Sequence, residues 1–476
     1  MRPIVIVGSC AVSTVLAACG SSRSSEPGDA GDSGDDSPLD AQIDASSGDA
    51  GVGEAAPGDA GAFVPGAANA ELISTSPARV LTPPAWNEHL PKLVGDGSFL
   101  YAVHTYFMDP VGTRFAAILR RPAAPAIGAG HWTEVARVTT PHQPPGVVMD
   151  TSLRMHMVFD CLRPGATDVE CFPGGAGTQG NTSRFYHLVF GARDAGGALR
   201  FDTYANANEW TAESNGYHGV GTTADGATWW SLADANWARV VQWSKGAQGG
   251  TVATLTLPNA YLLYPIHAAH PALGSGELVA YAGEFDPGGG NNASYLASTA
   301  YSGNLSGLSQ LFRRAPSASA PGTVAAFPSD IAFDAAGTLY ALSYLASDGG
   351  RCTELLRFDG GLGAPPTILP VGCASDYATL HFSRAGVLYL LTDASGASVT
   401  LGVSPDRGAT WTWHNIPIQG VPASSGDVQF HGFTPVKPYT SPALFDPDTL
   451  VFFFYGADAE NGVSNSYLGV IRLTSQ

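Results

Sequence analysis

The sequence predicts an all-β fold built from repeated antiparallel hairpins, and three observations support this prediction. Beyond residue 66 the chain has few charged residues and is rich in Gly, Pro and aromatic residues. Short alternating or apolar runs are separated by turn residues, which is typical of strands and not of long amphipathic helices. Similar hairpin units recur about every 57 residues, a length that suits a four-stranded propeller blade.

Each unit has a short apolar strand, a turn rich in Gly, Asp or Ser, and a second strand rich in Leu, Tyr, Phe or Trp. The units lie at 93–101, 147–159, 220–232, 272–281, 331–342, 380–391 and 443–454. Second hairpins are expected between the units, for example 116–119 with 135–138 and 240–243 with 252–255. We therefore predict a β-propeller of seven four-stranded blades, with six or eight blades as the alternatives.

The last unit has no fourth strand after the apolar run 467–472. An apolar run without a partner, at about 71–81, precedes the first unit. We expect this run to complete the last blade, so that the ring closes without exposed strand edges. The propeller domain is then expected to occupy residues 66–476.

The first residues have the pattern of an export signal. An apolar run at 4–16 is too short to span a bilayer as a helix. It ends in Leu-Ala-Ala-Cys at 16–19, which resembles the lipobox of bacterial lipoproteins. The resemblance implies a signal peptide at 1–18, a lipid on Cys19 and, because Gly20 is not aspartate, anchoring at the outer membrane. An ordinary cleaved signal peptide is the alternative.

Residues 19–65 are predicted to be a disordered tether. They consist mainly of Gly, Ala, Ser, Pro and Asp, and the tetrapeptide Gly-Asp-Ala-Gly starts at 28, 48 and 58. Such a composition cannot bury enough apolar surface to fold. The acidic residues of this segment supply about half of the net charge of −18. No cluster of Lys or Arg is present anywhere in the sequence, so we expect no nucleic-acid partner.

Four cysteines lie outside the export signal, in two local pairs. An exported protein meets an oxidising compartment, so we predict the disulfides Cys161–Cys171 and Cys352–Cys373. A zinc site is the alternative, although neither pair has C-x-x-C spacing and no histidine lies at a matching interval.

Residues 404–411 read Ser-Pro-Asp-Arg-Gly-Ala-Thr-Trp. They resemble the Asp box of bacterial neuraminidase (BNR) repeats, which is a structural turn at the periphery of a propeller blade. The resemblance gives structural and not catalytic roles to its residues, which are Ser404, Asp406, Gly408, Thr410 and Trp411. A degenerate copy at 225–229 is one residue short, and an inner-hairpin turn is its alternative interpretation.

Histidines and tyrosines recur just before the expected inner strands. Propeller sites lie where the inner strands begin, so the pattern predicts a polar, aromatic mouth of the central channel, suited to sugars or peptides. Packing of tyrosines between blades is the alternative. The candidate residues are His89, His104, His142, Tyr217, His218, His270, Tyr377 and Tyr439.

The first unit gives a sharper prediction. If residues 96 and 97 form a two-residue type I′ turn, His89 and His104 are direct cross-strand partners at the mouth. The segment 87–104 resembles a motif of a BNR-type propeller family that includes some ulvan lyases. In those lyases such histidines act with a tyrosine and an arginine in β-elimination of a uronate polysaccharide.

The resemblance implies a proton shuttle and a uronate partner, for which the candidates are Tyr217 and either Arg184 or Arg239. The chain departs from the family pattern at Asn87, where the family has aspartate, and in its shorter interval between the histidines. A histidine pair that only forms hydrogen bonds at the rim is therefore the alternative.

Three function classes remain open: binding of an extracellular polysaccharide at the channel mouth, a polysaccharide lyase, and a scaffold for an envelope protein. A sialidase is disfavoured because the sequence has no Phe/Tyr-Arg-Ile-Pro tetrapeptide. No cofactor is expected. The H-x-x-H spacing of His267 and His270 lacks an acidic partner, and a calcium site around Glu284, Asp286 and Asn291 has only weak support.

Overall fold

Every regular element in the described part of the chain is a β-strand, as predicted. The computed structural model describes residues 67–75, 90–108, 113–124, 130–139, 144–161, 184–210, 214–223, 228–234, 237–243, 251–256, 261–269, 278–286, 295–304, 307–314, 323–347, 350–361, 364–372, 378–393, 398–421, 428–458 and 463–473. All of them belong to one unit, Pro65–Gln476. In these ranges no helix is present that could cross a membrane.

Three sheets have four antiparallel strands each, in chain order. The first contains β2 (Leu93–Gly95), β3 (Phe99–Met108), β4 (Thr113–Pro122) and β5 (Thr133–Thr139). The second contains β6 (Gly146–Met149), β7 (Met155–Cys161), β8 (Arg184–Phe190) and β9 (Ala205–Trp210). The third contains β10 (Ser214–Thr222), β11 (Thr228–Asp234), β12 (Trp237–Trp243) and β13 (Thr251–Thr256).

An eight-stranded sheet follows, made of two groups of four. Its strands are β14 (Tyr261–Ala269), β15 (Leu278–Asp286), β16 (Tyr295–Asn304), β17 (Gly307–Arg314), β18 (Thr323–Phe333), β19 (Leu339–Ser347), β20 (Gly350–Arg357) and β21 (Thr367–Gly372). The groups β14–β17 and β18–β21 meet at a single parallel pair, Leu296 with Ala325.

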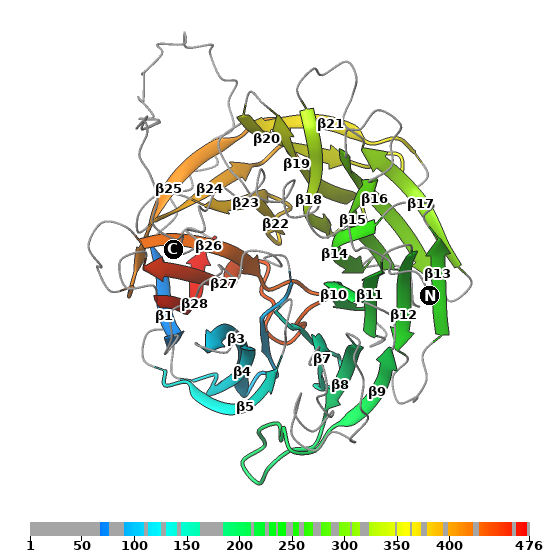
Figure 1. Cartoon of the computed structure of the whole chain (residues 1–476). Coiled ribbons are helices and arrows are strands. Elements are labelled where there is room, and N and C mark those ends of the chain that lie inside the picture. Colours follow the sequence, from blue (N-terminus) through cyan, green and yellow to red (C-terminus); the bar gives the residue numbers. More distant parts are fainter. Residues whose placement is uncertain are drawn as a thin grey trace, which may run out of the picture. The chain divides into compact units, whose positions relative to one another are not determined.

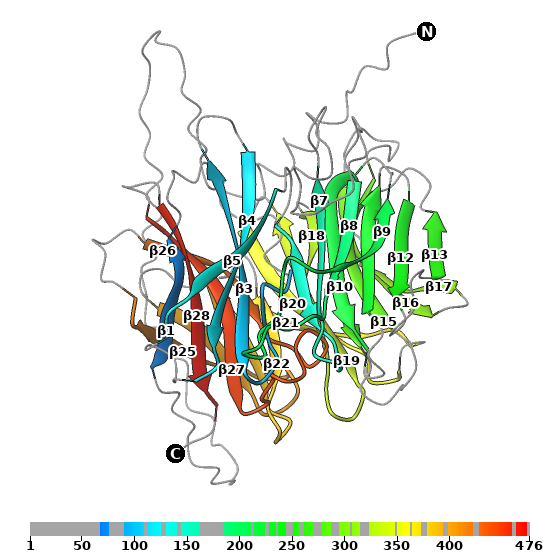
Figure 2. The same ribbon diagram turned by 90° about the horizontal axis from the view of Figure 1, so that it is seen from below.

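A second eight-stranded sheet contains both ends of the described chain. Its strands are β22 (Ala378–Phe382), β23 (Leu388–Asp393), β24 (Ser398–Ser404), β25 (Thr412–Gln419), β1 (Ala68–Thr75), β28 (Val463–Arg472), β27 (Thr449–Asp458) and β26 (Val428–Pro435). Figure 1 shows the sheets of this unit side by side around a centre, and Figure 2 shows their strands running along the line of sight of Figure 1.

The expected pairing of an N-terminal strand with the end of the chain is present. β1 runs antiparallel to β28, with Ala70 opposite Gly469. Glu71 in β1 forms an ion pair of 2.8 Å with Arg121 and accepts a hydrogen bond from Trp132, so the strand is also tied to the first sheet. β1 begins three residues earlier than predicted, at Ala68, and residues 76–81 lie outside the described part.

Five of the seven predicted inner hairpins coincide with observed strand pairs, namely β2–β3, β6–β7, β10–β11, β18–β19 and β22–β23. Both predicted second hairpins are also present, as β4–β5 and β12–β13.

The unit predicted at 272–281 is wrong in its first strand, because the inner strand is β14 and lies earlier in the sequence, whereas its second strand overlaps β15. The unit at 443–454 is wrong in the same way: its inner strand is β26, and residues 436–448 form a long connection to β27. The sequence misled here because Asp446 begins a tight turn like those of the other units, with its carboxylate accepting the Asp448 amide.

Neighbouring sheets bury their faces against each other. Tyr101 of β3, Met155 of β7 and Phe190 of β8 share one core, and Ala102 of β3 packs in another with Phe453 of β27. Successive residues of β3 therefore face different neighbours, as the two-residue period of a strand requires. A large apolar side chain buried in this way contributes about 1.5–3 kcal/mol.

Candidate functional site in the central channel

The inner strands surround a small cavity at the centre of the ring, lined by both apolar and polar residues. Its volume of about 30 Å³ has room for about two water molecules and is too small for a sugar ring. Any ligand site must therefore lie outside this cavity. The lining residues come from six inner strands or the segments beside them, and they are Leu90, Pro91, Val220, Ile266, His267, Ser329, Asp330, Thr379, Thr434, Pro435, Lys437, Tyr439 and Thr440.

The connection after β26 closes one end of the channel. The Met149 amide donates to the Thr440 carbonyl at 2.8 Å, and the Thr222 amide donates to the Tyr439 carbonyl at 2.8 Å. The Gly95 amide donates to the Ser441 hydroxyl at 2.9 Å. Residues 437–441, here called the channel plug, thus join the inner strands of the first three sheets.

A buried ion pair fixes the other side of the channel plug. Lys437 Nζ lies 2.6 Å from Asp330 Oδ2 and also donates to the Leu380 carbonyl. The same carboxylate oxygen accepts the Leu380 amide at 2.6 Å. Burial lowers the pKa of Lys437, and the attraction of Asp330 acts against this shift. The carboxylate therefore holds the plug against both β18 and β22.

Tyr439 is part of the channel plug and not of an open mouth. The prediction placed it before an inner strand, whereas it follows β26 and is buried. Its hydroxyl donates to the Ile331 carbonyl at 2.7 Å, and burial raises its pKa well above the ordinary range. This side chain holds the plug in place and is closed to an outside ligand.

The predicted register of the first hairpin is wrong. Leu93 pairs with Ala102 and Gly95 with Leu100, so the turn is centred on residues 97–98 and position 91, not 89, lies opposite His104. His104 is wholly buried, its ring lies 6.3 Å from that of Tyr455, and burial lowers its pKa to about 4. It is a core histidine between the first sheet and β27.

His218 is buried in β10, and a side chain at Gly146 of β6 would come within 3.8 Å of its Nε2. The other candidates cannot be placed: His89, His142, His270, Tyr377 and Asn291 lie outside the described residues, and the side chains of Tyr217, Arg184, Arg239, Glu284 and Asp286 are not described. Their roles stay predictions. Among the described residues no cluster of His, Cys, Asp and Glu could hold a metal ion.

The Asp-box residues form the turn between β24 and β25. Asp406 accepts the Thr410 amide at 2.9 Å and the Thr410 hydroxyl at 2.6 Å, and Ser404 accepts the Gly408 amide at 2.7 Å. Burial opposes the shift, but these bonds from Thr410 lower the pKa of Asp406. Gly408 has a φ of +91°, which favours glycine.

A second turn of this kind lies between β8 and β9, and the sequence prediction missed it. Asp194 accepts the Gly196 amide at 2.9 Å and the Ala198 amide at 3.0 Å, the same one-to-five relation as between Asp406 and Thr410. The Asp-x-Gly spacing was the only available signal, because the flanking Ser and Trp are missing. The degenerate copy predicted at 225–229 falls at the inner hairpin of β10 and β11.

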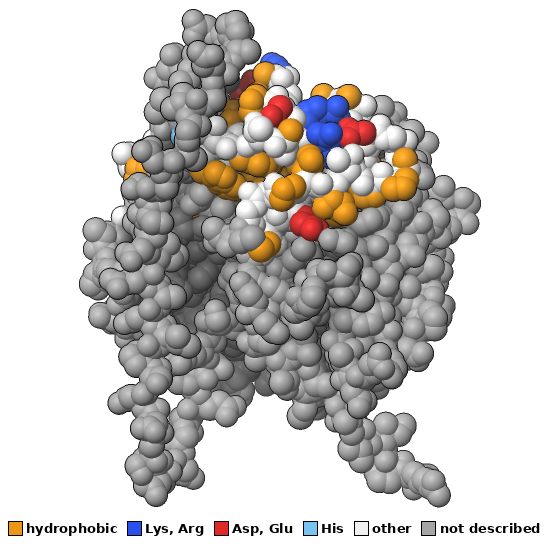
Figure 3. Space-filling view, turned by 90° about the horizontal axis from the view of Figure 1, so that it is seen from above, with side chains coloured by type: hydrophobic (Ala, Val, Ile, Leu, Met, Phe, Trp, Pro, Cys, Tyr) orange, Lys and Arg blue, Asp and Glu red, His pale blue; other side chains and the backbone are white. Residues whose placement is uncertain are grey.

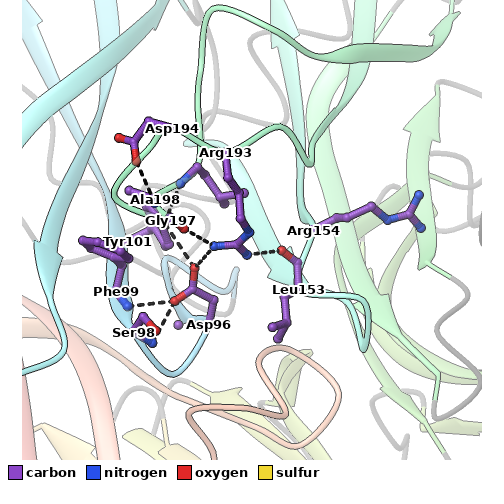
Figure 4. Close-up of polar contacts among 12 residues, drawn as sticks. Asp96, Ser98, Phe99, Tyr101, Leu153, Arg154, Arg193, Asp194, Gly197 and Ala198 are labelled. Carbon is purple, nitrogen blue, oxygen red and sulfur yellow. Dashed lines mark hydrogen bonds and ion pairs between the residues drawn. The ribbon is translucent and has the colours of Figure 1, made fainter.

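An arginine beside each of these turns reaches the inner turn of the preceding sheet. Arg193 lies 2.6 Å from Asp96 and donates to the Leu153 carbonyl at 2.8 Å (Figure 4). Arg407 donates to the Tyr340 hydroxyl at 2.7 Å and lies 3.5 Å from Asp334. The turns therefore clamp neighbouring sheets together, which is a structural function.

Known proteins resemble this chain in their three-dimensional structure and not in their sequence. No family model and no curated protein matches the sequence. A polysaccharide lyase described as a PL25 ulvan lyase aligns over 83% of this chain and 94% of that chain, with 10% identity and a TM-score of 0.55. The same figures hold for this lyase bound to -[GlcA(1-4)Rha3S]-.

The fold is that of a β-propeller. Identity of 10% shows nothing beyond the fold. A Trypanosoma rangeli sialidase aligns over 58% of this chain and 57% of that chain, with 10% identity and a TM-score of only 0.34, which is too low to indicate the same fold.

Two of the four paired cysteines lie in described strands. Cys352 lies in β20 and is disulfide-bonded, but Cys373 lies outside the described residues. Cys161 ends β7 and Cys171 is not described. Both pairings therefore stay predictions.

Proposed function

We propose that this chain is a seven-bladed β-propeller that binds an extracellular polysaccharide at the open end of its channel. The observation that carries the proposal is the likeness of the fold to a PL25 ulvan lyase over 94% of that chain. The strand order supports the blade count, because the two eight-stranded sheets divide into four groups of four strands beside three separate sheets.

The topology gives the end of the channel at which we expect the polysaccharide. The channel plug occupies the end near the inner turns, since Ser441 bonds to Gly95 at the start of the first turn. His89, His142 and Tyr377 come before β2, β6 and β22 in the sequence, so they are expected at the opposite end. That end is the proposed binding site.

The second candidate function is β-elimination at the same site. It is favoured by the activity of the structural relative, which is a polysaccharide lyase, and by the motif around His89. One histidine would remove the C5 proton of a uronate, an arginine would neutralise its carboxylate, and Tyr217 would protonate the leaving oxygen. Because His104 is buried, the partner of His89 would have to be another residue, and His142 is the candidate.

Export, a lipid on Cys19 and the 19–65 tether remain parts of the proposal. They would hold the propeller outside the cell membrane, where no ATP or NAD(P)H is available, which favours binding or chemistry that needs only water and protons. A scaffold for an envelope protein is the remaining alternative.

The test is to incubate the full-length protein with ulvan-type and other uronate polysaccharides and to measure retention in affinity gels. Ultraviolet absorbance of the unsaturated uronate product reports elimination in the same samples. We expect His89→Ala and His142→Ala to weaken binding, whereas His131→Ala, an exposed histidine before β5, leaves it unchanged. Absence of retention for every polysaccharide, together with capture of an envelope protein, would overturn the proposal.

A further inference from the structure

Two tryptophans stack on the outer surface of the propeller, at the Asp-box hairpin. The ring centroids of Trp411 and Trp413 are 5.8 Å apart, and their planes are inclined by 24°. Trp413 remains 42% exposed, so part of its side chain is open to a ligand. The pair lies on β25 and its preceding turn, away from the central cavity.

Glycine at position 402 makes room for this stack. Gly402 of β24 is the cross-strand partner of Trp413. A Cβ atom there would lie 2.8 Å from one ring atom of Trp413 and 3.0 Å from one of Trp411, closer than real contacts allow. Trp411 also packs against the core between β18–β21 and β22–β25. The two indoles are therefore held in one orientation before any ligand arrives.

The neighbour of Trp413 on the same strand face is exposed and neutral. Asn415 is exposed and lies on the same face of β25 as Trp413 because the two are two residues apart. Both charged residues of the hairpin turn are engaged: Arg407 contacts Asp359, and Asp406 accepts hydrogen bonds from Ser404 and Thr410. Figure 3 shows the side of the molecule that carries β20 and β21, where hydrophobic side chains gather beside a small group of charged ones.

A pyranose ring matches this combination of groups. Its two faces carry C–H groups whose hydrogens are slightly positive, and the face of an aromatic ring is slightly negative. Its hydroxyls need neutral donors and acceptors at the edge of the aromatic surface, which the side-chain amide of Asn415 can supply. A charged peptide or a nucleic acid would instead need unpaired cationic or anionic side chains beside the rings.

We propose that Trp413, supported by Trp411 and Gly402, is a second saccharide-binding site that stacks on one sugar ring of a polysaccharide chain. The inference rests on the proposed function, since it takes the same polymer as ligand. A polymer held at the channel end and at this platform at once gains affinity through effective concentration, without any new contact. A short oligosaccharide reaches one site only and gains nothing.

The test compares Trp413→Ala with Ile368→Ala, a residue of similar exposure on β21, at 43%. We expect Trp413→Ala to weaken binding of a long uronate polysaccharide about tenfold, while Ile368→Ala has no effect. Binding of a disaccharide unit at the channel end is expected to be unchanged. Trp413→Phe keeps an aromatic face and should restore most of the affinity, and equal urea midpoints confirm that each variant is folded.

The outcomes separate the two proposals. If the wild type binds the polymer and Trp413→Ala binds it equally well, the platform is refuted and the proposed function stands. If the wild type binds no polysaccharide, both are refuted. If Trp413→Ala instead changes a dimer into a monomer, the stack is an interface between two copies of the chain and the platform is refuted.

Discussion

The Nδ1 atom of His156 lies 2.9 Å from Nε2 of His187, and both rings are wholly buried within the second sheet. On its other side, His156 Nε2 lies 3.2 Å from Asp150 Oδ2. Burial would raise the pKa of Asp150, but the hydrogen bonds from His156 and Arg154 hold it at about 2, so the carboxylate only accepts. His156 therefore donates from Nε2, and its Nδ1 accepts a hydrogen bond from Nε2 of His187.

Asp150→Asn is expected to destabilise the protein by about 2–4 kcal/mol, because it weakens charged hydrogen bonds to a buried group. The carboxylate also accepts the Ser152 and Arg154 amides at 2.8 and 2.9 Å, so the substitution affects the turn and the histidine pair together. Urea unfolding measures the loss. Asp202→Asn is the control, since Asp202 is exposed and its partner Arg200 is exposed too; an equal loss in both variants would contradict the prediction.

Acid is expected to destabilise the propeller between pH 6.5 and about 4. Burial lowers the pKa of His104 and His381 from the ordinary value of 6.5 to about 4. In this window the unfolded chain binds protons that the folded chain does not, so stability falls as the pH falls, by up to about 3 kcal/mol for each histidine. The free energy of unfolding, measured in urea across this range, checks the sign.

His104→Leu should reduce this pH dependence, since leucine cannot take up a proton in the unfolded state. His131→Gln changes an exposed histidine and should leave the dependence as it is in the wild type. A His104→Leu variant with the full wild-type dependence would show that His104 does not contribute to it.

The sequence predicted the strands well because their determinants are local. The apolar alternation and the turn residues of units such as 331–342 and 380–391 specify a hairpin without reference to the rest of the chain. The closing strand could also be found, because β28 needs a partner and the 71–81 run was the one apolar segment left over.

The candidate site was predicted less well because it depends on register and on distant contacts. The turn is centred on residues 97 and 98 and not on 96 and 97 as expected, and this shift of one residue changes the residue opposite His104. The channel plug was missed because its contacts, from Ser441 to Gly95 and from Lys437 to Asp330, join residues more than 100 positions apart. No local pattern encodes such contacts.

Leu153→Gly is expected to stabilise the protein by about 1 kcal/mol. Leu153 has a φ of +59° at the inner turn of the second sheet, where two other inner turns with the same hydrogen bonds place Gly337 and Gly386 at the equivalent position with a positive φ. A left-handed conformation costs a residue with a Cβ about 1–2 kcal/mol, and Leu153 is 37% exposed, so little packing is lost.

Gly386→Ala is the matched reverse change. A Cβ at position 386 would meet no atom within 4 Å, so any destabilisation comes from the backbone angle and not from a clash. Thermal unfolding of the two variants should move in opposite directions. A destabilised Leu153→Gly variant would instead assign the exposed leucine a packing role that outweighs its strain.

Lys437→Met is expected to destabilise the protein by about 3–5 kcal/mol, because it leaves the Asp330 carboxylate buried without its cation. Lys437→Met with Asp330→Asn should recover part of this loss, since the asparagine oxygen can still accept the Leu380 amide and no buried charge remains. Hydrogen exchange gives a second readout: the amides of Met149 and Thr222, which donate to the channel plug, should exchange faster in Lys437→Met.

The control is Arg384→Met, because 74% of the Arg384 side chain is open to solvent where it pairs with Asp448. Loss of this ion pair should cost less than about 1 kcal/mol. If Lys437→Met cost no more than Arg384→Met and left both amides as protected as before, the plug would be held by its backbone hydrogen bonds and not by the buried ion pair.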